Sequence, residues 1–443
     1  MLTALGVLLF VVGLLFSIWW HELGHYLAAK KFGMRVSQFF VGFGPTMWSR
    51  QRGETEHGIK WIPLGGFIRI VGMIPPARKP DKDIAGGRFS DLITQVREQS
   101  QAEVLPTDGD RVFYAKPWWQ RAITMIAGPI QNAILAAIIF TIVLTAFGVA
   151  TPSLTVQTVT ECVLPSTTNA KNCTTPVDKD GRVCEAGATD CALPPKSPAA
   201  EAGFRPGDTI TELNGEPVGN WDDIRSEIRV SAGEQLVFGV DRAGESLQLS
   251  LTPMPNKVRA DDNPDQTVTV GYVGIAPTTP MTPMPISEVP GYVGSIVSTA
   301  VDRIIELPSR VPQLFRATFA GEERDPEGPV GVVGVGRLSG EILALDQPVA
   351  ERVAYFLSLL ASLNLMLFLF NLLPLYPLDG GHIVGALYEG VRNGVYRLRR
   401  KVPPGPVDTA RMMPVAYVVA SVFIVFSGLL VIADIINPIT LNG

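Results

Sequence analysis

The sequence predicts a polytopic α-helical membrane protein with four transmembrane helices, a membrane-associated β-hairpin or sheet and an inserted α+β domain. Three observations predict this class. Apolar residues make up 47% of the 443 residues and charged residues only 18%. The mean hydropathy is positive, at +0.24, which is unusual for a soluble enzyme. Long uncharged runs separate the charged segments, as is typical of membrane-spanning helices.

Four uncharged runs are long enough to cross a bilayer, which takes about 20 residues of helix. The first lacks a basic leading segment and a small-residue cleavage site, so we expect it to stay in the protein and not to be removed as a signal peptide. The other runs lie between Arg121 and Glu161, between Arg352 and Asp379, and between Arg411 and Asp434. The expected helices lie near residues 2–29, 121–149, 353–378 and 412–436.

The charge of each polar segment predicts the orientation. Residues 26–121 hold 15 Lys/Arg and 9 Asp/Glu, residues 150–350 hold 15 and 27, and residues 380–411 hold 6 and 2. Basic loops stay on the cytoplasmic side of a membrane, so both termini and the acidic block are expected outside. An acidic block of this size also excludes nucleic-acid binding as the main activity, because it repels phosphates.

The acidic block holds all four cysteines, Cys162, Cys173, Cys184 and Cys191. Their spacing matches no zinc ribbon, and an oxidising compartment favours disulfides, so two bridges are expected. The sequence leaves all three pairings open.

A small α+β domain follows the cysteines. Residues 199–215 read AAEAGFRPGDTITELNG, in which Asn-Gly marks a tight turn. A helix is expected over residues 221–230 and a hairpin over residues 236–251. The segment resembles a PDZ domain, a fold that binds an extended peptide at a sheet edge; a small α+β domain without a ligand is the alternative. Residues 253–290 are proline-rich and are expected to form a semi-rigid connector.

The strongest chemical signal is His21-Glu22-Leu23-Gly24-His25, at the end of the first span. Positions i and i+4 share a helix face, so both imidazoles can reach one ion while Glu22 reaches a bound water. In zinc hydrolases this spacing supplies two ligands and a general base. An ionisable group inside a span costs about 2.5 to 3.5 kcal/mol and rarely persists without a role. An interfacial polar cluster, the alternative, does not explain two histidines at ligand spacing.

A catalytic zinc site needs a third protein ligand. Asp379 is the only acidic residue near the end of the third span, in NLLPLYPLDGGH at residues 371–382. The prolines interrupt the helix and the glycines free the backbone, so Asp379 can be presented at the cytoplasmic side, at the depth of His25. Helix capping by Asp379 is compatible with this role. His382 is the alternative ligand, although a supporting or packing role is the favoured interpretation for it, and His57 is expected to be a solvated loop residue.

Residues 36–73 have the alternation and glycine turns of short strands, and they are too polar to span the bilayer. We expect a membrane-associated sheet whose stretch at residues 59–73 offers an edge to an unwound substrate. Gly65, Gly66 and Phe67 are the substrate contacts expected there. An ordinary cytoplasmic hairpin is the alternative. Residues 80–118 are polar, with Ile84, Leu92, Ile93 and Val96 loosely spaced for an amphipathic helix.

Together these motifs resemble the site-2 protease family of intramembrane zinc metalloproteases. The resemblance rests on H-E-x-x-H in the first span, N-x-x-P-x-x-x-L-D-G near the third and a PDZ-like insertion between the second and third. Further matches are VGFGP at residues 41–45, PLGGFIRIVGM at 63–73 and GPIQN at 128–132. The likeness extends over most of the chain and fits best the bacterial branch with an extracytoplasmic PDZ domain.

The resemblance implies a zinc metalloendopeptidase with one Zn²⁺ per chain, held by His21, His25 and Asp379, with Glu22 as the base. It implies further that Asn371 and Asn364 contact the substrate backbone. The implied activity is cleavage of single-pass membrane proteins within or near their transmembrane segment, in a bacterial plasma membrane, with the active site toward the cytoplasm. Such regulated proteolysis often acts on anti-sigma factors that an upstream site-1-type protease has trimmed, and the PDZ-like domain excludes intact substrates. The rivals are another H-E-x-x-H membrane protease with a different third ligand, and a non-catalytic PDZ scaffold.

The expected division of the chain follows from these assignments. Its membrane-associated first part comprises residues 1–30 (first transmembrane helix with H-E-x-x-H), 31–75 (β region), 76–120 (cytoplasmic juxtamembrane segment) and 121–149 (second transmembrane helix). The remainder comprises residues 150–260 (PDZ-like domain with a cysteine-containing insertion), 261–350 (proline-rich connector and pre-membrane segment), 351–382 (third transmembrane helix with L-D-G), 383–411 (cytoplasmic basic loop) and 412–443 (fourth transmembrane helix and tail).

Overall fold

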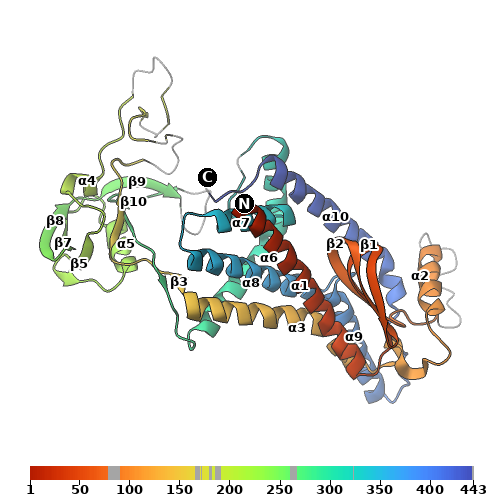
Figure 1. Cartoon of the computed structure of the whole chain (residues 1–443). Helices are drawn as coiled ribbons and strands as arrows, with labels where there is room; N and C mark the ends of the chain where they lie inside the picture. The colour runs from red at the N-terminus through yellow and green to blue at the C-terminus, as the bar shows by residue number, and fades with distance from the viewer. Residues whose placement is uncertain are drawn as a thin grey trace. The chain divides into compact units, whose positions relative to one another are not determined.

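The computed structural model describes residues 1–77, 90–164, 170, 172–178, 182–184, 191–259, 267–322 and 324–441. The chain forms two compact units (Figure 1). Met1–Phe147 and Met284–Gly443 make the first, called the membrane unit here, and Gly148–Pro283 makes the second, called the inserted unit.

Helices dominate the membrane unit. They are α1 (Leu2–Lys31), α2 (Ser90–Ala102), α3 (Trp118–Ile142), which continues into a π-helical turn (Val143–Phe147), α6 (Val289–Phe319), α7 (Val332–Ala344), α8 (Val349–Leu372), α9 (Asp379–Leu398) and α10 (Met413–Ile436). Short 3-10 turns cover Gly109–Arg111, Phe113–Ala115 and Thr409–Met412.

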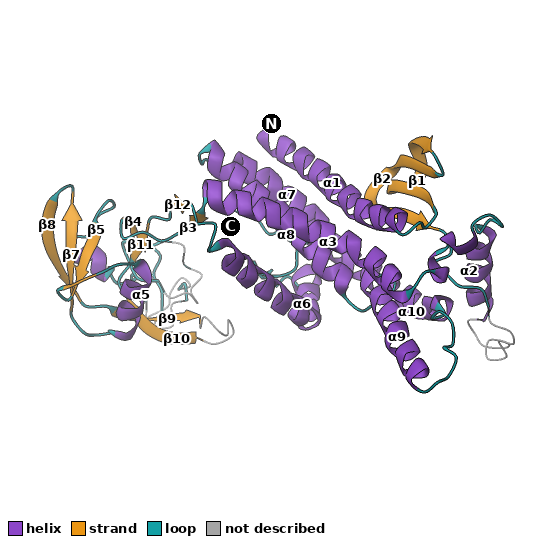
Figure 2. Ribbon diagram, turned by 90° about the horizontal axis from the view of Figure 1, so that it is seen from below, coloured by secondary structure: helices purple, strands orange, loops and turns teal. Residues whose placement is uncertain are grey.

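Four helical segments of the described chain are long and apolar enough to cross a membrane: Leu2–Lys31, Trp118–Phe147, Val349–Leu372 and Thr409–Ile436. They confirm the four predicted spans, so the chain has the helices of a multi-pass membrane protein. Helix α1 packs against α3 and α7, and α3 packs against α8 and α9 (Figure 2).

The third span differs from its predicted bounds of residues 351–382. Helix α8 ends at Leu372, and the L-D-G segment opens a separate helix, α9, for which Leu378 is the N-cap residue. Pro374 and Pro377 lie between the two helices, and neither can donate the backbone hydrogen bond that a continuous helix requires. The segment at residues 383–411, predicted as a cytoplasmic basic loop, is helical in its first part, because α9 continues to Leu398.

The β region consists of two long, bent strands, β1 (Val36–Arg52) and β2 (Thr55–Ile70). The first half of β1 is paired on both sides, since Val41 lies opposite Ile59 on one side and Gly66 on the other. The half-strands therefore lie side by side in the order 46–52, 55–62, 36–43 and 66–70. Residues 66–70 form an outer edge, so the predicted edge at residues 59–73 is wrong in its first part.

The segment between the sheet and α3 contains α2, and Leu92, Ile93 and Val96 of the predicted amphipathic helix lie on it. Ile84 lies outside the described residues. An ion pair of 2.7 Å joins Arg97 of α2 to Asp408, in the segment that leads into α10.

The inserted unit is a β-rich domain with two short helices. Its elements are β3 (Val149–Ala150), β4 (Val156–Val159), α4 (Pro198–Ala202), β5 (Thr209–Leu213), β6 (Glu216–Pro217), α5 (Trp221–Val230), β7 (Leu236–Arg242), β8 (Glu245–Leu251), β9 (Met254–Arg259), β10 (Thr267–Tyr272), β11 (Ile275–Pro277) and β12 (Met281–Thr282). Four strands form an antiparallel sheet in the order β6-β5-β7-β8, and β9–β10, β4–β11 and β3–β12 form separate pairs.

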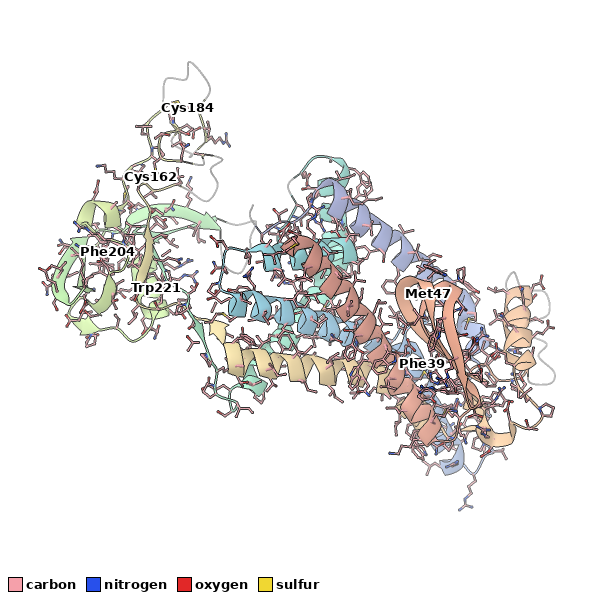
Figure 3. All side chains as sticks on the ribbon, viewed as in Figure 1. Phe39, Met47, Cys162, Cys184, Phe204 and Trp221 are labelled. Atoms are coloured by element: carbon pink, nitrogen blue, oxygen red, sulfur yellow. A yellow bond between two sulfur atoms is a disulfide. The ribbon has the colours of Figure 1, made fainter. Side chains whose placement is uncertain are left out.

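The local elements of this unit follow the sequence closely. Helix α5 occupies residues 221–230 and the β7–β8 hairpin residues 236–251, as predicted. Asn214 and Gly215 have φ values of 55° and 81° and form the turn between β5 and β6, where such values favour these two residue types. Phe204 and Phe238 pack edge to face in the core, which Trp221 also enters (Figure 3).

The predicted connector at residues 253–290 is wrong. These residues form strands β9 to β12 and the start of α6, and the pairs stay two-stranded, which gives proline the sheet edges that it needs. The unit therefore extends to Pro283 instead of ending at residue 260, and residues 261–350 also contain the helices α6 and α7.

The structure joins Cys162 to Cys173 and Cys184 to Cys191. Both bridges close short loops, with sequence separations of 11 and 7 residues. The sequence had left this pairing open.

A buried carboxylate at the start of β5 is bonded to the end of β7 in the inserted unit. Asp208 is fully buried and accepts two hydrogen bonds from the Arg242 guanidinium, at 2.7 and 2.9 Å, and one from the Arg205 amide at 2.8 Å. The hydrogen bonds from Arg242 lower the pKa of Asp208. Because the pKa is lowered on folding, the carboxylate stabilises the fold fully above its unfolded pKa of about 4, and this contribution is lost as the pH falls through the folded pKa.

Replacing Asp208 with Asn should therefore destabilise the inserted unit by about 1 to 3 kcal/mol at neutral pH, because Arg242 loses its charged partner. Hydrogen exchange of β5 and β7 in the full-length protein measures the effect. The variant should also lose stability less steeply than the parent below about pH 4. Equal exchange in the two proteins at neutral pH would contradict this role.

Candidate metal centre

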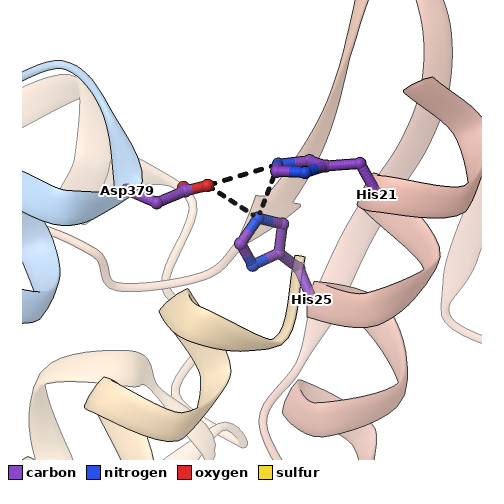
Figure 4. A group of neighbouring side chains, drawn as sticks. All are labelled: His21, His25 and Asp379. Carbon is purple, nitrogen blue, oxygen red and sulfur yellow. Dashed lines mark hydrogen bonds and ion pairs between the residues drawn. The ribbon is translucent and has the colours of Figure 1, made fainter. Parts of the chain in front are cut away.

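Three predicted site residues converge in the membrane unit. His21 and His25 lie one turn apart on α1, and Asp379 is the first residue of α9 (Figure 4). The two Nε2 atoms are 3.2 Å apart, and Asp379 Oδ2 lies 3.2 Å from each of them. One donor atom from each residue thus points at a common centre.

The spacing of these atoms fits a tetrahedral ion. Ligands bound at about 2.0 to 2.1 Å in a tetrahedron lie roughly 3.3 to 3.4 Å from one another, close to the three separations of 3.2 Å. The buried Asp379 Oδ2 also has no hydrogen-bond donor within the described residues. An unsatisfied buried oxygen is costly, and a cation between the three atoms would satisfy it.

The far side of each imidazole is held by α3. His25 Nδ1 lies 2.8 Å from the carbonyl oxygen of Thr124, and His21 Nδ1 lies 3.1 Å from Asn132 Oδ1. With both Nδ1 atoms donating to these oxygens, both Nε2 atoms present a lone pair to the centre, which is the tautomer that a metal requires. Helix α3 therefore sets the direction of both rings.

The hydrogen-bonded chain continues beyond Asn132. Asn132 donates to Asn364 Oδ1 on α8 at 3.2 Å, and Asn364 donates to Ser17 Oγ on α1 at 2.9 Å. All three side chains are fully buried. A polar network thus connects His21 to three of the apolar helices.

Close contact between α1 and α3 depends on glycine. A Cβ atom at Gly128 would lie 2.2 Å from His25 Nε2, far inside van der Waals contact. The GPIQN motif at residues 128–132 therefore supplies both the space for one ring and, through Asn132, the partner of the other.

Asp379 reaches the centre because α9 is fixed to α3. Buried Arg121 of α3 donates to Glu389 of α9, and Glu389 also accepts a 2.8 Å hydrogen bond from the Val407 amide. Gly390 of α9 lies against Trp118, where a Cβ atom would come within 2.6 Å of the indole. These contacts hold the helix that begins with the carboxylate.

Glu22 lies beside the sheet edge. A Cβ atom at Gly66 would lie 3.1 Å from Glu22 Cγ and 2.8 Å from Ile18 Cγ2. The backbone of Ile68 also lies near the Glu22 carboxyl group. The predicted base thus adjoins residues 66–70, while His21 and His25 on the same helix face the centre.

Several predicted residues lie away from the three donor atoms. Asn364 is fully buried and bonded within the polar network, and its contact with a substrate stays a prediction. Asn371 is half-buried and donates to the Leu367 carbonyl oxygen at 2.9 Å. His382, the alternative ligand, lies against the ring of Tyr376.

Two details of the surrounding sheet also emerge. His57 was expected to be solvated; it is partly buried, and its ring contacts those of Tyr26 and Phe39. Phe67 stacks on Phe40, with ring centroids 5.7 Å apart, and Gly65 adopts a φ of +89° beside Phe43. Gly65, Gly66 and Phe67 therefore shape the sheet next to α1.

Sequence reasoning missed the roles of Thr124 and Asn132. The Thr124 contact uses a backbone oxygen, which no residue type reveals. Asn132 had a signal, since a polar amide in an uncharged span needs a partner, but the sequence did not show which residue it meets.

Two imidazoles and a carboxylate that meet among apolar helices define a class of protein, the membrane-embedded metal hydrolases. The comparisons give the family. Residues 9–402 match the model of peptidase family M50. The chain is 32% identical to the zinc metalloprotease Rip1 of Mycobacterium tuberculosis over the full length of both chains. It is 29% identical to the metalloprotease MmpA of Caulobacter vibrioides, over 87% of this chain and 86% of the relative, and 27% identical to the zinc metalloprotease RasP of Geobacillus kaustophilus, over 87% and 90%.

The chain belongs to peptidase family M50, the site-2 protease family. It is a zinc metalloendopeptidase of the site-2 protease type with Zn²⁺ as its cofactor. Membership in a family of proteases argues against the scaffold alternative.

Replacing Asn132 with Ala should lower zinc affinity or turnover by about 10- to 100-fold, because His21 loses the partner that orients its ring. Zinc titration and cleavage of a tagged membrane substrate measure the two effects. Ser17→Ala, at the far end of the same network, is the matched control and should have a smaller effect. An Asn132→Ala protein with parental zinc affinity and turnover would show that the hydrogen bond does not orient the ring.

Proposed function

We propose that the chain is an intramembrane endopeptidase that cuts single-pass membrane proteins within or near their transmembrane segment. Its zinc ligands are His21, His25 and Asp379, and Glu22 is the general base. The convergence of one carboxylate oxygen and two Nε2 atoms at mutual distances of 3.2 Å supports this proposal most directly. The alternative, a different third ligand, has less support, because this trio is the group of donors that the described residues bring together.

The chemistry follows from the positions of the side chains. Bound zinc supplies a Lewis acid that polarises the scissile carbonyl group and lowers the pKa of a water toward about 7. The Glu22 carboxylate takes the proton from the attacking water and delivers it to the leaving amine. Thr124 and Asn132 keep both imidazoles in the tautomer that leaves Nε2 free. Helix α3 packs against α1 and α9, which carry the three donors.

A substrate helix must unwind before it can be cut, because its carbonyl groups are engaged in hydrogen bonds. Among the described strands, the segment at residues 66–70 pairs on one side only, and it lies beside Glu22. It takes up the unwound strand by β-addition, which supplies the backbone hydrogen bonds that the substrate loses. In this role Gly65, Gly66 and Phe67 shape the edge, and Asn371 is a further contact.

The positive-inside rule supports an orientation in a bacterial plasma membrane. Both termini and the inserted unit are extracytoplasmic, and the active site faces the cytoplasm. We assign the inserted unit to the PDZ class on its AGFRPGD segment and on the arrangement of β5, β6, α5, β7 and β8. It excludes untrimmed substrates, so that regulated proteolysis, for instance of anti-sigma factors, follows cleavage by an upstream site-1-type protease.

Glu22→Gln and Asp379→Ala should separate the two proposed roles. The first removes the base and should abolish cleavage of a tagged single-span substrate while zinc stays bound, because the ligands are intact. The second removes a ligand and should lose both zinc and cleavage. Zinc content and cleavage are measured for both in the full-length protein. Zinc binding and activity retained in Asp379→Ala would favour a different third ligand, and equal cleavage by Glu22→Gln and the parent would refute the base.

Arg69→Pro should lower cleavage more than Arg69→Ala, with zinc content unchanged in both. Proline removes one amide donor from the outer half-strand, whereas alanine keeps the backbone and removes the same side chain. Arg50→Pro, in the outer half-strand on the opposite side of the sheet, controls for general damage and should cleave like the parent. Equal activity of the Arg69 variants would count against substrate pairing at this edge.

A further inference from the structure

Helix α9 has an apolar face that no described element covers. Val384, Leu387, Val391, Val395 and Leu398 are exposed, with fractions of 70% for Val391 and 85% for Leu398. Their spacing of three and four residues places them on one stripe of the helix. Tyr388 is exposed on the same stripe.

The opposite face of the first half of α9 packs inside the protein. Gly381, Ala386 and Glu389 are buried, and this face packs on α3 through the Arg121–Glu389 ion pair. The stripe thus begins on the outward face of a helix whose first half is anchored, and it ends where α9 is exposed on all sides.

Basic residues gather where the stripe ends. Residues 390–407 contain Arg392, Arg397, Arg399, Arg400 and Lys401 and no Asp or Glu. Arg397, Arg399, Arg400 and Lys401 are exposed, and no ion pair joins them to a carboxylate in the described part of the chain. Four like charges in five residues repel one another, so they favour an anionic partner.

We propose that α9 docks on an anionic phospholipid surface. The stripe enters the boundary between headgroups and acyl chains, and Arg397, Arg399, Arg400 and Lys401 bind the phosphate groups. An apolar helix face with a cluster of four or more basic residues is the pattern that recognises anionic membranes. The chain's own spans keep α9 beside a bilayer. A second copy of the chain fits less well, since it would bring the same positive charge to the contact.

The test uses the full-length protein with Leu398→Cys labelled by an environment-sensitive fluorophore. All four native cysteines are in disulfides, so the new thiol reacts alone. The protein is reconstituted into vesicles of phosphatidylcholine, or of equal parts phosphatidylcholine and phosphatidylglycerol. The emission should shift to the blue only in the anionic vesicles, and salt should reverse the shift because it screens the charges.

A triple variant, Arg397→Gln/Arg399→Gln/Lys401→Gln, should dock more weakly. Each basic residue near an anionic surface contributes roughly fivefold to binding, so the ratio of docked to free helix should fall on the order of a hundredfold. These side chains are exposed, so the fold should survive, and unchanged zinc content checks this. Lys196→Gln/Arg205→Gln/Arg225→Gln removes the same charge from the inserted unit and should leave the signal unchanged.

Three outcomes would overturn the proposal. The first is an equal emission in both kinds of vesicle, which would mean that charge does not direct docking. The second is loss of the shift in the control triple variant, which would make net charge the cause. The third is a shift that depends on the protein-to-lipid ratio, which would point to a second copy of the chain.

Discussion

The contact between α1 and α3 is the constraint on which the site depends. A histidine inside an apolar span must have every polar atom engaged, because lipid offers no hydrogen bonds. Here α3 engages the Nδ1 atoms of both histidines, one through a backbone carbonyl and one through Asn132. Gly128 permits the approach, since a Cβ atom would collide with His25. The two Nε2 atoms are thus oriented by a second span and not by the motif that carries them.

The same helix also fixes the third donor. Helix α8 ends at Leu372, and the chain restarts as α9 at Asp379, which places a carboxylate at a helix N-terminus. Arg121 and Glu389 then tie α9 to α3 within the protein. A buried ion pair gains little net stability, because both charges lose their hydration. Its geometry is nevertheless specific, and in this site it sets where the carboxylate lies.

Much of this arrangement could be predicted from the sequence, because its strongest signals are local. Uncharged runs gave the spans, and the spacing of His21 and His25 gave the shared helix face. A helix-like stretch predicted α5, and alternating apolar residues predicted the β7–β8 hairpin. The features that the sequence did not predict depend on contacts between residues far apart in the chain. Nothing local shows that Val41 is paired on both sides, that Asn364 bonds with Asn132 and Ser17, or that proline-rich residues after Leu251 form strands. Those outcomes depend on partners far along the chain.

Glu22, the proposed base, lies where the sheet meets helix α1. On α1 it follows a residue whose ring faces the three-donor centre, yet its own side chain lies against Gly66 and near the Ile68 backbone. A hydrolase that acts on a membrane helix needs its base near both a metal and an exposed backbone edge, since a helical substrate offers no free carbonyl group. Successive residues of a helix point about 100° apart, so His21 can face the three-donor centre while Glu22 faces the sheet. Because residue 66 is glycine, the strand can lie close to α1. Glu22 then contacts the strand, while His21 beside it on the helix faces the three-donor centre.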